Sequence, residues 1–247
     1  MIRALHREIR AVTFDCWGTL LSYEPAQGRS HQLRVRALHQ ALQTAGLNPA
    51  LEEAAARLAD AHKKHISAWE SAISTGSPEI ARWALEACGV ADREIERRLV
   101  GEFEEAALQI EVAALDGALE TLRALGQRDI RMALICDTGF TPGRVVRQLL
   151  DRVELLQWLE LQIFSNEAGM TKPHAPVFRA ALDGLDADPS HTIHVGDLRR
   201  TDIQGARELG MGTIRIRDFN DDDSDLPDAD AVADHHPHLL EILGVTS

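Results

Sequence analysis

A short apolar strand that ends at a carboxylate constrains this chain more than any other feature. The run from Ile9 to Phe14 is apolar and partly β-branched, as in a buried strand, and Asp15 follows it directly. In open α/β sheets, ligands and reacting groups collect at the carboxyl ends of strands. Asp15 is therefore either a side chain that caps the turn or a carboxylate placed to attack an electrophile.

The stretch from about residue 29 to residue 111 holds no convincing strand. Its Ala- and Leu-rich segments have helical periodicity, and Pro, Gly and Asn separate them. We predict helices at Ser30–Ala45, Pro49–Ser74, Pro78–Cys88 and Asp92–Ile110. The expected organisation is a helical cap domain at residues 22–111, inserted into a core domain made of residues 1–21 and 112–247.

Strands and helices alternate again after residue 117, which is typical of a parallel sheet with helices on both faces. The predicted strands are Ile130–Cys136, Leu161–Phe164, Thr192–Val195, Gly212–Arg217 and Ala229–Ala233. The predicted helices are Ala118–Gly126, Pro142–Leu150, Thr201–Leu209 and Pro237–Leu243. Aromatic residues make up only 4% of the chain, so the core of this α/β fold must consist mainly of Ala, Leu, Val and Ile.

Two polar clusters in this second half resemble the one at Asp15. Thr138 and Gly139 follow a predicted strand, where a hydroxyl and exposed backbone amides are able to hold an anionic oxygen, although Asp-Thr-Gly is also a good helix cap. Lys172 precedes Pro173, which we expect to begin a helix and to hold the ammonium at its mouth. Most lysines, however, are solvated surface groups.

A third cluster carries two carboxylates on one loop. Asp197 follows the predicted strand Thr192–Val195 after Gly196, and Asp202 lies five residues further on, at the start of a predicted helix. Paired carboxylates are suitable oxygen ligands for Mg²⁺. Asp202 is alternatively explained by its favourable interaction with the helix dipole.

Composition narrows the possible functions. The net charge of -13 argues against a nucleic-acid binder, but a small anionic substrate remains compatible with it where a metal ion and local cations offset the field. Cys16, Cys88 and Cys136 show no paired spacing, so neither a disulfide framework nor a zinc site is indicated. No apolar run approaches a membrane span and no signal-peptide core follows the N-terminus, so we expect a cytoplasmic protein. The sequence leaves the oligomeric state open.

The segment from Asp218 to Asp230 contains seven aspartates. Runs of like charge are usually solvated. We therefore expect this segment to be a solvated loop.

The four clusters, in this order through an α/β pattern, resemble the motifs of the haloacid dehalogenase superfamily of hydrolases. The resemblance covers essentially the whole chain and implies a Rossmann-like parallel sheet with an all-helical cap inserted between the first and second motifs. It implies that Asp15 is the nucleophile, which forms an aspartyl intermediate, and that Thr138 holds the transferred group. Lys172 would orient the nucleophile and offset negative charge.

The same resemblance implies a magnesium site. In the phosphatase branch its ligands would correspond to Asp15, Asp197, Asp202 and the backbone carbonyl of Trp17. Substrate identity in this family depends largely on the cap and on the loop after the first motif. The residues expected to face the substrate are Trp17, Gly139, Tyr23 and Arg29.

Trp17 departs from the phosphatase pattern, in which a second Asp at this position protonates the leaving group. An indole is unable to do so, and the loss of a general acid costs about 10²–10⁴-fold in rate. An aromatic residue here resembles the metal-independent 2-haloacid dehalogenases, whereas the run from Gly196 to Asp202 resembles the metal-binding form. We favour a magnesium-dependent phosphatase of a small phosphorylated metabolite. The alternatives are a 2-haloacid dehalogenase and a non-catalytic binding protein with this fold.

Overall fold

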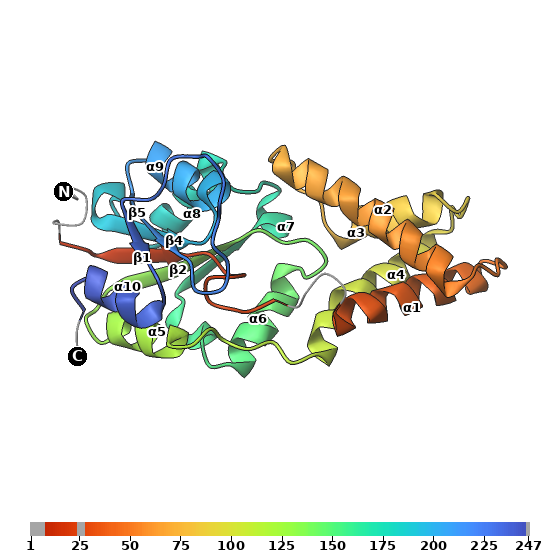
Figure 1. The fold of residues 1–247 in the computed structure, drawn as a ribbon, viewed down its shortest axis with the longest axis horizontal. Helices are drawn as coiled ribbons and strands as arrows, with labels where there is room; N and C mark the ends of the chain where they lie inside the picture. Colours follow the sequence, from red (N-terminus) through yellow and green to blue (C-terminus); the bar gives the residue numbers. More distant parts are fainter. Residues whose placement is uncertain (1–7, 24–27, 246–247) are drawn as a thin grey trace. The chain divides into compact units, whose positions relative to one another are not determined.

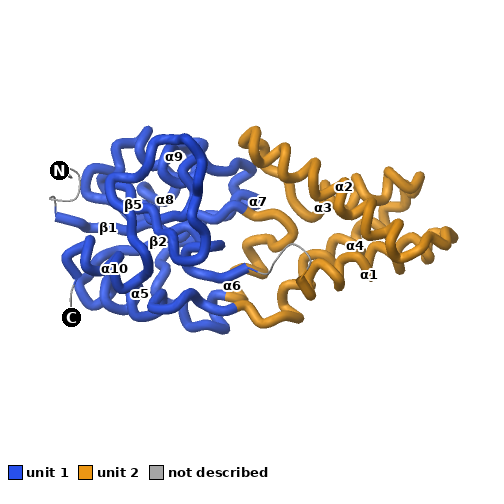
Figure 2. The backbone as a smooth tube through the Cα atoms, in the orientation of Figure 1, with its two compact units in different colours: residues 1–23, 113–137, 150–247 blue, residues 24–112, 138–149 orange. Residues whose placement is uncertain are grey.

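The computed structural model describes residues 8–23 and 28–245, which fall into two compact units (Figure 2). Unit 1 comprises residues 1–23, 113–137 and 150–247, and unit 2 comprises residues 24–112 and 138–149. Residues 138–149, which the sequence assigned to the core domain, thus group with unit 2. The functional division into a core domain and a cap domain stays a prediction.

Unit 1 is built on a parallel sheet, six-stranded in the described part of the chain, with the order β3-β2-β1-β4-β5-β6 (Figure 1). The strands are β1 (Ala11–Phe14), β2 (Arg131–Cys136), β3 (Leu161–Phe164), β4 (Thr192–Gly196), β5 (Gly212–Ile216) and β6 (Ala231–Ala233). Every residue of β1, β4 and β5 is buried, which explains why these strands are nearly continuous apolar runs. The predicted α/β fold with a parallel sheet is confirmed.

Helices cover both faces of this sheet, as predicted. In Figure 1, α8 (Ala175–Gly184) and α9 (Gln204–Glu208) lie on one face, and α5 (Ala118–Gly126) and α10 (His236–Ile242) lie on the other. The remaining elements between β2 and β4 are α6 (Gly143–Arg152), η2 (Leu156–Trp158), α7 (Ser165–Ala168) and η3 (Pro189–His191). A five-residue π-helix, η4 (Arg199–Ile203), leads into α9.

The start of α8 differs from the prediction. Pro173 does not begin this helix, because the backbone N–H of His174 donates to the carbonyl of Thr171 and closes a turn first. The helix begins at Ala175, with Pro176 in its first turn. Lys172 is thus held by a turn that precedes the helix, rather than by the helix mouth itself.

The sheet order places β1 next to the point where the order of strand addition switches from one side of the sheet to the other. After β1 the sheet grows through β2 and β3 on one side, and the chain then returns to build β4, β5 and β6 on the other side. In such sheets the loops that leave the two central strands turn apart, and a crevice forms at their carboxyl ends. The segments that follow β1 and β4 therefore share this crevice.

Unit 2 consists of helices and loops, and none of its described residues lies in a strand. Its helices are α1 (Arg29–Thr44), α2 (Leu51–Glu70), α3 (Ser77–Glu86), α4 (Arg93–Glu105), η1 (Ala106–Gln109) and most of α6. Leu38, Leu58, Ile80 and Phe103 meet in its fully buried core. Within the described ranges, no helix of either unit combines the length and apolarity that crossing a membrane requires.

The packing of α8 against α9 gives a prediction for Gly205. A Cβ atom at this position would lie 2.4 Å from a ring carbon of Phe178 and 2.9 Å from the carbonyl oxygen of Pro173. Gly205→Ala is therefore expected to destabilise the protein by about 1–3 kcal/mol through overpacking. Urea unfolding measures this change, and Gln204→Ala, at an exposed neighbouring position, serves as the control. Equal stability of the two variants would contradict the packing.

Candidate active site

Asp15 and Asp197 leave the sheet side by side because β1 and β4 are hydrogen-bonded neighbours. Phe14 is in register with Val195, and the N–H of Asp15 donates to the carbonyl of Val195 at 2.8 Å. Gly18 follows with φ of +80°, and a Cβ atom there would lie 2.7 Å from Asp197 Oδ2. A glycine is therefore needed to turn the chain so closely past this carboxylate.

Lys172 joins the two carboxylates Asp15 and Asp202. Its Nζ lies 2.5 Å from Asp15 Oδ1 and 2.6 Å from Asp202 Oδ1, and its side chain is only 2% exposed. The backbone N–H of Lys172 donates to Asp137 Oδ1 at 3.0 Å, which fixes the segment that carries it. Burial acts to lower the pKa of Lys172, but the surrounding carboxylates outweigh it and raise this pKa, so the ammonium stays charged.

Asp202 accepts hydrogen bonds on both carboxylate oxygens. Besides Lys172, the ring of His194 contacts Oδ1 at 3.3 Å, and the N–H of Leu198 and the hydroxyl of Thr201 reach Oδ2 at 3.0 and 3.3 Å. Burial acts against ionisation, yet the charge of Lys172 and these hydrogen bonds lower the pKa of Asp202. Asp202 is thus a fixed anion that holds Lys172.

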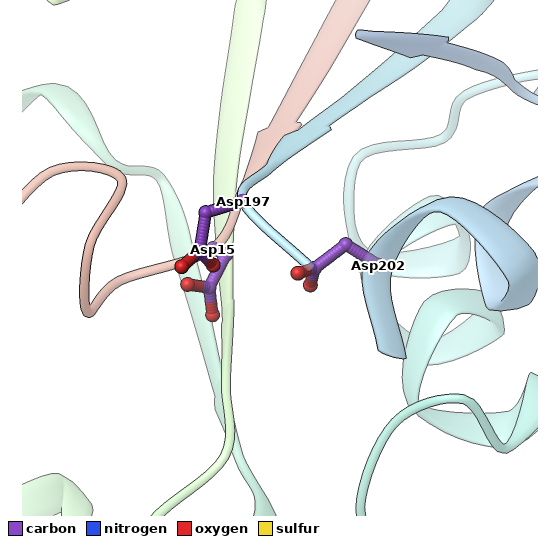
Figure 3. A group of neighbouring side chains, drawn as sticks. All are labelled: Asp15, Asp197 and Asp202. Carbon is purple, nitrogen blue, oxygen red and sulfur yellow. The ribbon is translucent and has the colours of Figure 1, made fainter. Parts of the chain in front are cut away.

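Asp15, Asp197 and Asp202 form a cluster of three buried carboxylates. One oxygen from each lies within 4.8 Å of those of the others, and Figure 3 shows the Asp15 and Asp197 carboxylates close together with Asp202 reaching in from the helix side. Burial raises the pKa of Asp15 well above its usual value, with neighbouring carboxylates adding to the rise and Lys172 opposing it. Three carboxylates against one ammonium leave an excess of negative charge that suits a divalent cation.

His194 is a site residue that the sequence analysis missed. It belongs to β4, is completely buried, and its Nδ1 lies 2.8 Å from the hydroxyl oxygen of Thr13 on β1. Burial lowers the pKa of His194, which favours the neutral ring. Thr13 and His194 are polar residues inside fully buried strands, and because buried polar groups need partners, their positions were the available signal.

The acidic segment 218–230 is a loop whose aspartates are exposed or half-exposed, as predicted, but the fold also anchors it. Arg215, only 3% exposed, contacts Asp228 at 2.8 Å and Asp221 at 2.7 Å. Arg199 adds a backbone contact to Asp222 at 2.6 Å. Two arginines, one in η4 and one in β5, thus hold a segment whose other aspartates stay exposed or half-exposed.

This anchored segment reaches the candidate site through two residues. The amide of Asn220 donates to Asp197 Oδ2 at 2.9 Å. The ring of Phe219 meets that of Tyr23 edge to face, with 4.6 Å between centroids. Tyr23 is half exposed. Partial burial and the negative charges of Asp197 and Asp15 raise the pKa of its phenol, so Tyr23 lies within the electrostatic influence of the carboxylate cluster. Trp17, between Asp15 and Gly18, is partly buried.

Three of the predicted site residues, Thr138, Gly139 and Arg29, belong to unit 2. Thr138 follows Asp137 directly and is buried, and Arg29 begins α1 and is exposed. At Gly139 a Cβ atom would lie 2.7 Å from His65 Nε2, so this backbone passes very close to α2. The structure brings together Asp15, Lys172, Asp197 and Asp202, and the roles of the other predicted residues stay predictions.

Comparisons with known proteins agree on a family. The family model described as haloacid dehalogenase-like hydrolase matches residues 9–210. A glyceraldehyde 3-phosphate phosphatase of Pyrococcus furiosus is 33% identical over 130 residues, which cover 51% of this chain and 53% of that protein. The chain thus spans about half the length of this curated relative.

Two further matches extend over most of the chain. The haloacid dehalogenase-like hydrolase domain-containing protein 3 of Bos taurus is 23% identical over 85% of this chain and 83% of its own length. The crystal structure of a 2-haloacid dehalogenase from Pseudomonas syringae superposes with a TM-score of 0.67, at 24% identity, over 96% of this chain and 98% of that one. This structural likeness concerns the fold alone.

The crowded carboxylates predict an unusual pH dependence of stability. Burial and the charge of Asp202 raise the pKa of Asp197 to about 7, compared with about 3.9 in an unfolded chain. The folded state therefore binds an extra proton at Asp197 between these values, so the contribution of this residue to the stability of the metal-free protein should fall by up to about 4 kcal/mol as the pH rises from 4 to 7. Urea unfolding in a chelating buffer at pH 5 and pH 8 measures the change.

Asp197→Asn is expected to remove this contribution, because the amide does not ionise, so the variant should lose less stability, or gain more, than the wild type between pH 5 and pH 8. Asp225→Asn, at an exposed position in the acidic segment, is the matched control and should keep the wild-type slope. The same change in stability between pH 5 and pH 8 in the wild type and in Asp197→Asn would contradict this electrostatic account.

Proposed function

Because the chain belongs to the haloacid dehalogenase-like hydrolase family, we propose that it is a magnesium-dependent phosphatase of a small phosphorylated metabolite. Membership of the family confirms the resemblance drawn from the four motifs. The proposal concerns the finer points, which are the transferred group, the metal and the residues that act.

One observation carries the proposal: a buried ammonium, that of Lys172, lies between two carboxylates while a third stands beside them. Phosphoryl transfer requires little covalent chemistry from the protein beyond an in-line nucleophile and compensation of negative charge. Asp15 is the proposed nucleophile, and two observations support this role: it directly follows the central strand β1, and its Oδ1 is held by the Lys172 ammonium. Glyceraldehyde 3-phosphate phosphatases among the relatives support a phosphorylated substrate.

The carboxylates fit a magnesium ion. Asp15 and Asp197 would hold it, with the backbone carbonyl of Trp17 as the further ligand expected in this family. Both oxygens of Asp202 already accept hydrogen bonds. Asp202 would therefore add negative charge near the ion and fix the position of Lys172. Bound Mg²⁺ would neutralise charge on the phosphoryl oxygens and relieve the repulsion between the carboxylates.

In the proposed reaction, Asp15 Oδ attacks the phosphorus atom and the bond from phosphorus to the substrate oxygen breaks. This produces an aspartyl-phosphate, and water then attacks phosphorus to release inorganic phosphate and regenerate Asp15. Lys172 orients the attacking carboxylate and offsets the charge that accumulates on the transferred group. Thr138 would donate its hydroxyl to a phosphoryl oxygen. Trp17 supplies no proton, so leaving groups of low basicity should react fastest.

A second candidate function is supported by Trp17 alone. An aromatic residue two positions after the nucleophile resembles the 2-haloacid dehalogenases, in which the carboxylate displaces halide without a metal. In that reaction a cluster of three carboxylates would repel the anionic substrate, which is why the phosphatase is preferred. A binding protein without turnover is the third possibility.

Asp15→Asn tests the nucleophile. An amide oxygen does not form the covalent intermediate, so turnover of an aryl phosphate in the presence of Mg²⁺ should fall by at least roughly 10³-fold. Initial rates with and without a chelator measure both this loss and the metal requirement. Asp225→Asn is the control and should keep its rate. Halide release from a 2-chloroacid without metal would instead identify the dehalogenase.

Trp17→Asp tests the account of the missing acid. The new carboxyl group could protonate a basic leaving group, so the rate on alkyl phosphates should rise by up to about 10²-fold or more, and that on aryl phosphates much less. Parallel measurements of kcat/KM on both substrate classes give the comparison. An equal gain on the two classes, or none on either, would remove this explanation of Trp17.

A further inference from the structure

Behind the Lys172 ammonium lies a buried chain of polar contacts that begins with two residues, Thr13 and His194, that the sequence analysis did not single out. It runs from the hydroxyl of Thr13 to His194 Nδ1 at 2.8 Å, and from His194 Nε2 to Asp202 Oδ1 at 3.3 Å. It continues from Asp202 Oδ1 to Lys172 Nζ at 2.6 Å, and from Nζ to Asp15 Oδ1 at 2.5 Å. All five side chains are at most 10% exposed.

The strand register explains why the first two members meet. Thr13 and His194 are directly opposite each other on the neighbouring strands β1 and β4. The ring of Phe178 covers that of His194 edge to face, with 5.1 Å between centroids, and closes the site from the side of α8. The imidazole is therefore held between a hydroxyl and a carboxylate with little freedom to rotate.

The hydrogen-bond chemistry determines the direction of this chain. An ionised carboxylate only accepts hydrogen bonds, so the ring nitrogen that faces Asp202 must carry the proton. In a neutral imidazole the other nitrogen then accepts, and the hydroxyl of Thr13 donates to it. The required form of His194 is thus the Nε2–H tautomer.

We propose that His194, oriented by Thr13, is a positioning residue that holds Asp202 so that Lys172 is directed at Asp15. The inference rests on the proposed function for its kinetic consequence, but its structural part stands without it. Asp202 has contacts on both oxygens, and His194 is the side chain that shares Oδ1 with Lys172. Without it, Lys172 is left as the remaining side-chain partner of Oδ1, and the contacts of Leu198 and Thr201 to Oδ2 restrain the direction of the ammonium less closely.

Two substitutions of His194 separate positioning from packing. His194→Gln keeps an N–H donor near the place of Nε2, whereas His194→Leu fills a similar volume without a donor. We expect His194→Leu to lower kcat on an aryl phosphate by roughly 10–100-fold with KM changed by less than about 3-fold, as for other residues that support a reacting group. His194→Gln should recover most of kcat. Equal losses in both variants, or no loss in either, would overturn the proposal.

Thr13 offers an independent test in case His194→Leu does not fold. Thr13→Val removes the donor to His194 Nδ1 at nearly constant volume, and kcat should fall by about 3–10-fold. Thr121→Val is the matched control, because the hydroxyl of Thr121 is equally buried and has no hydrogen-bond partner among the residues that the structure describes. A control loss as large as that of Thr13→Val would count against the proposal.

A spectroscopic measurement distinguishes failure of this inference from failure of the proposed function. Nitrogen-15 NMR of the folded wild-type protein at pH 7 reports the tautomer of His194, which is assigned by its absence in His194→Gln. The Nε2–H tautomer, with a shift towards Nδ1–H in Thr13→Val, supports the proposal, and an Nδ1–H tautomer in the wild type overturns it. Absence of phosphatase activity would contradict the proposed function, but the NMR result would still decide whether His194 is oriented as proposed.

Discussion

The buried ion pair network of Lys172 is the interaction on which the candidate site depends. A lone ammonium inside a protein is costly, and so is a lone carboxylate, but here one cation lies within 2.6 Å of oxygens from both Asp15 and Asp202. The network still carries more negative than positive charge because Asp197 adds a third carboxylate. Such a site is held together by the fold around it, and its excess of negative charge is what the proposed function assigns to a bound cation.

The sheet supplies the rigidity that this arrangement requires. Asp15 and Asp197 extend from neighbouring central strands, so their separation follows from the strand spacing and from the register of Phe14 with Val195. Lys172 comes from a turn before α8, and its backbone is fixed by Asp137 at the end of β2. Three adjacent strands thus contribute to one site at their carboxyl ends, where parallel sheets concentrate reacting groups.

A second network of charged residues, between two arginines and the acidic segment 218–230, positions a neighbour of the Asp197 carboxylate. Arg199 and Arg215 fix the acidic segment by pairing with Asp222 and Asp228, and this segment then presents Asn220 to Asp197. Pairing with Arg215 lowers the pKa of Asp228, so this attachment is ionic at neutral pH. The acidic segment, which the sequence predicted as a solvated loop, is therefore tied to Asp197 in the candidate site.

The sequence by itself determined the α/β fold, the strandless region after β1 and the four polar clusters, because these depend on periodicity and on local turn chemistry. It also singled out Asp15, Lys172, Asp197 and Asp202, since each stands at a strand end or beside a Pro-containing turn. It did not identify His194 as a site residue, because the role of a histidine in an apolar strand depends on which residues lie next to it in the folded sheet. That pairing, like the attachment of the acidic segment, was decided by tertiary structure, since both unite side chains that are distant in the chain and match only when the strands are in register.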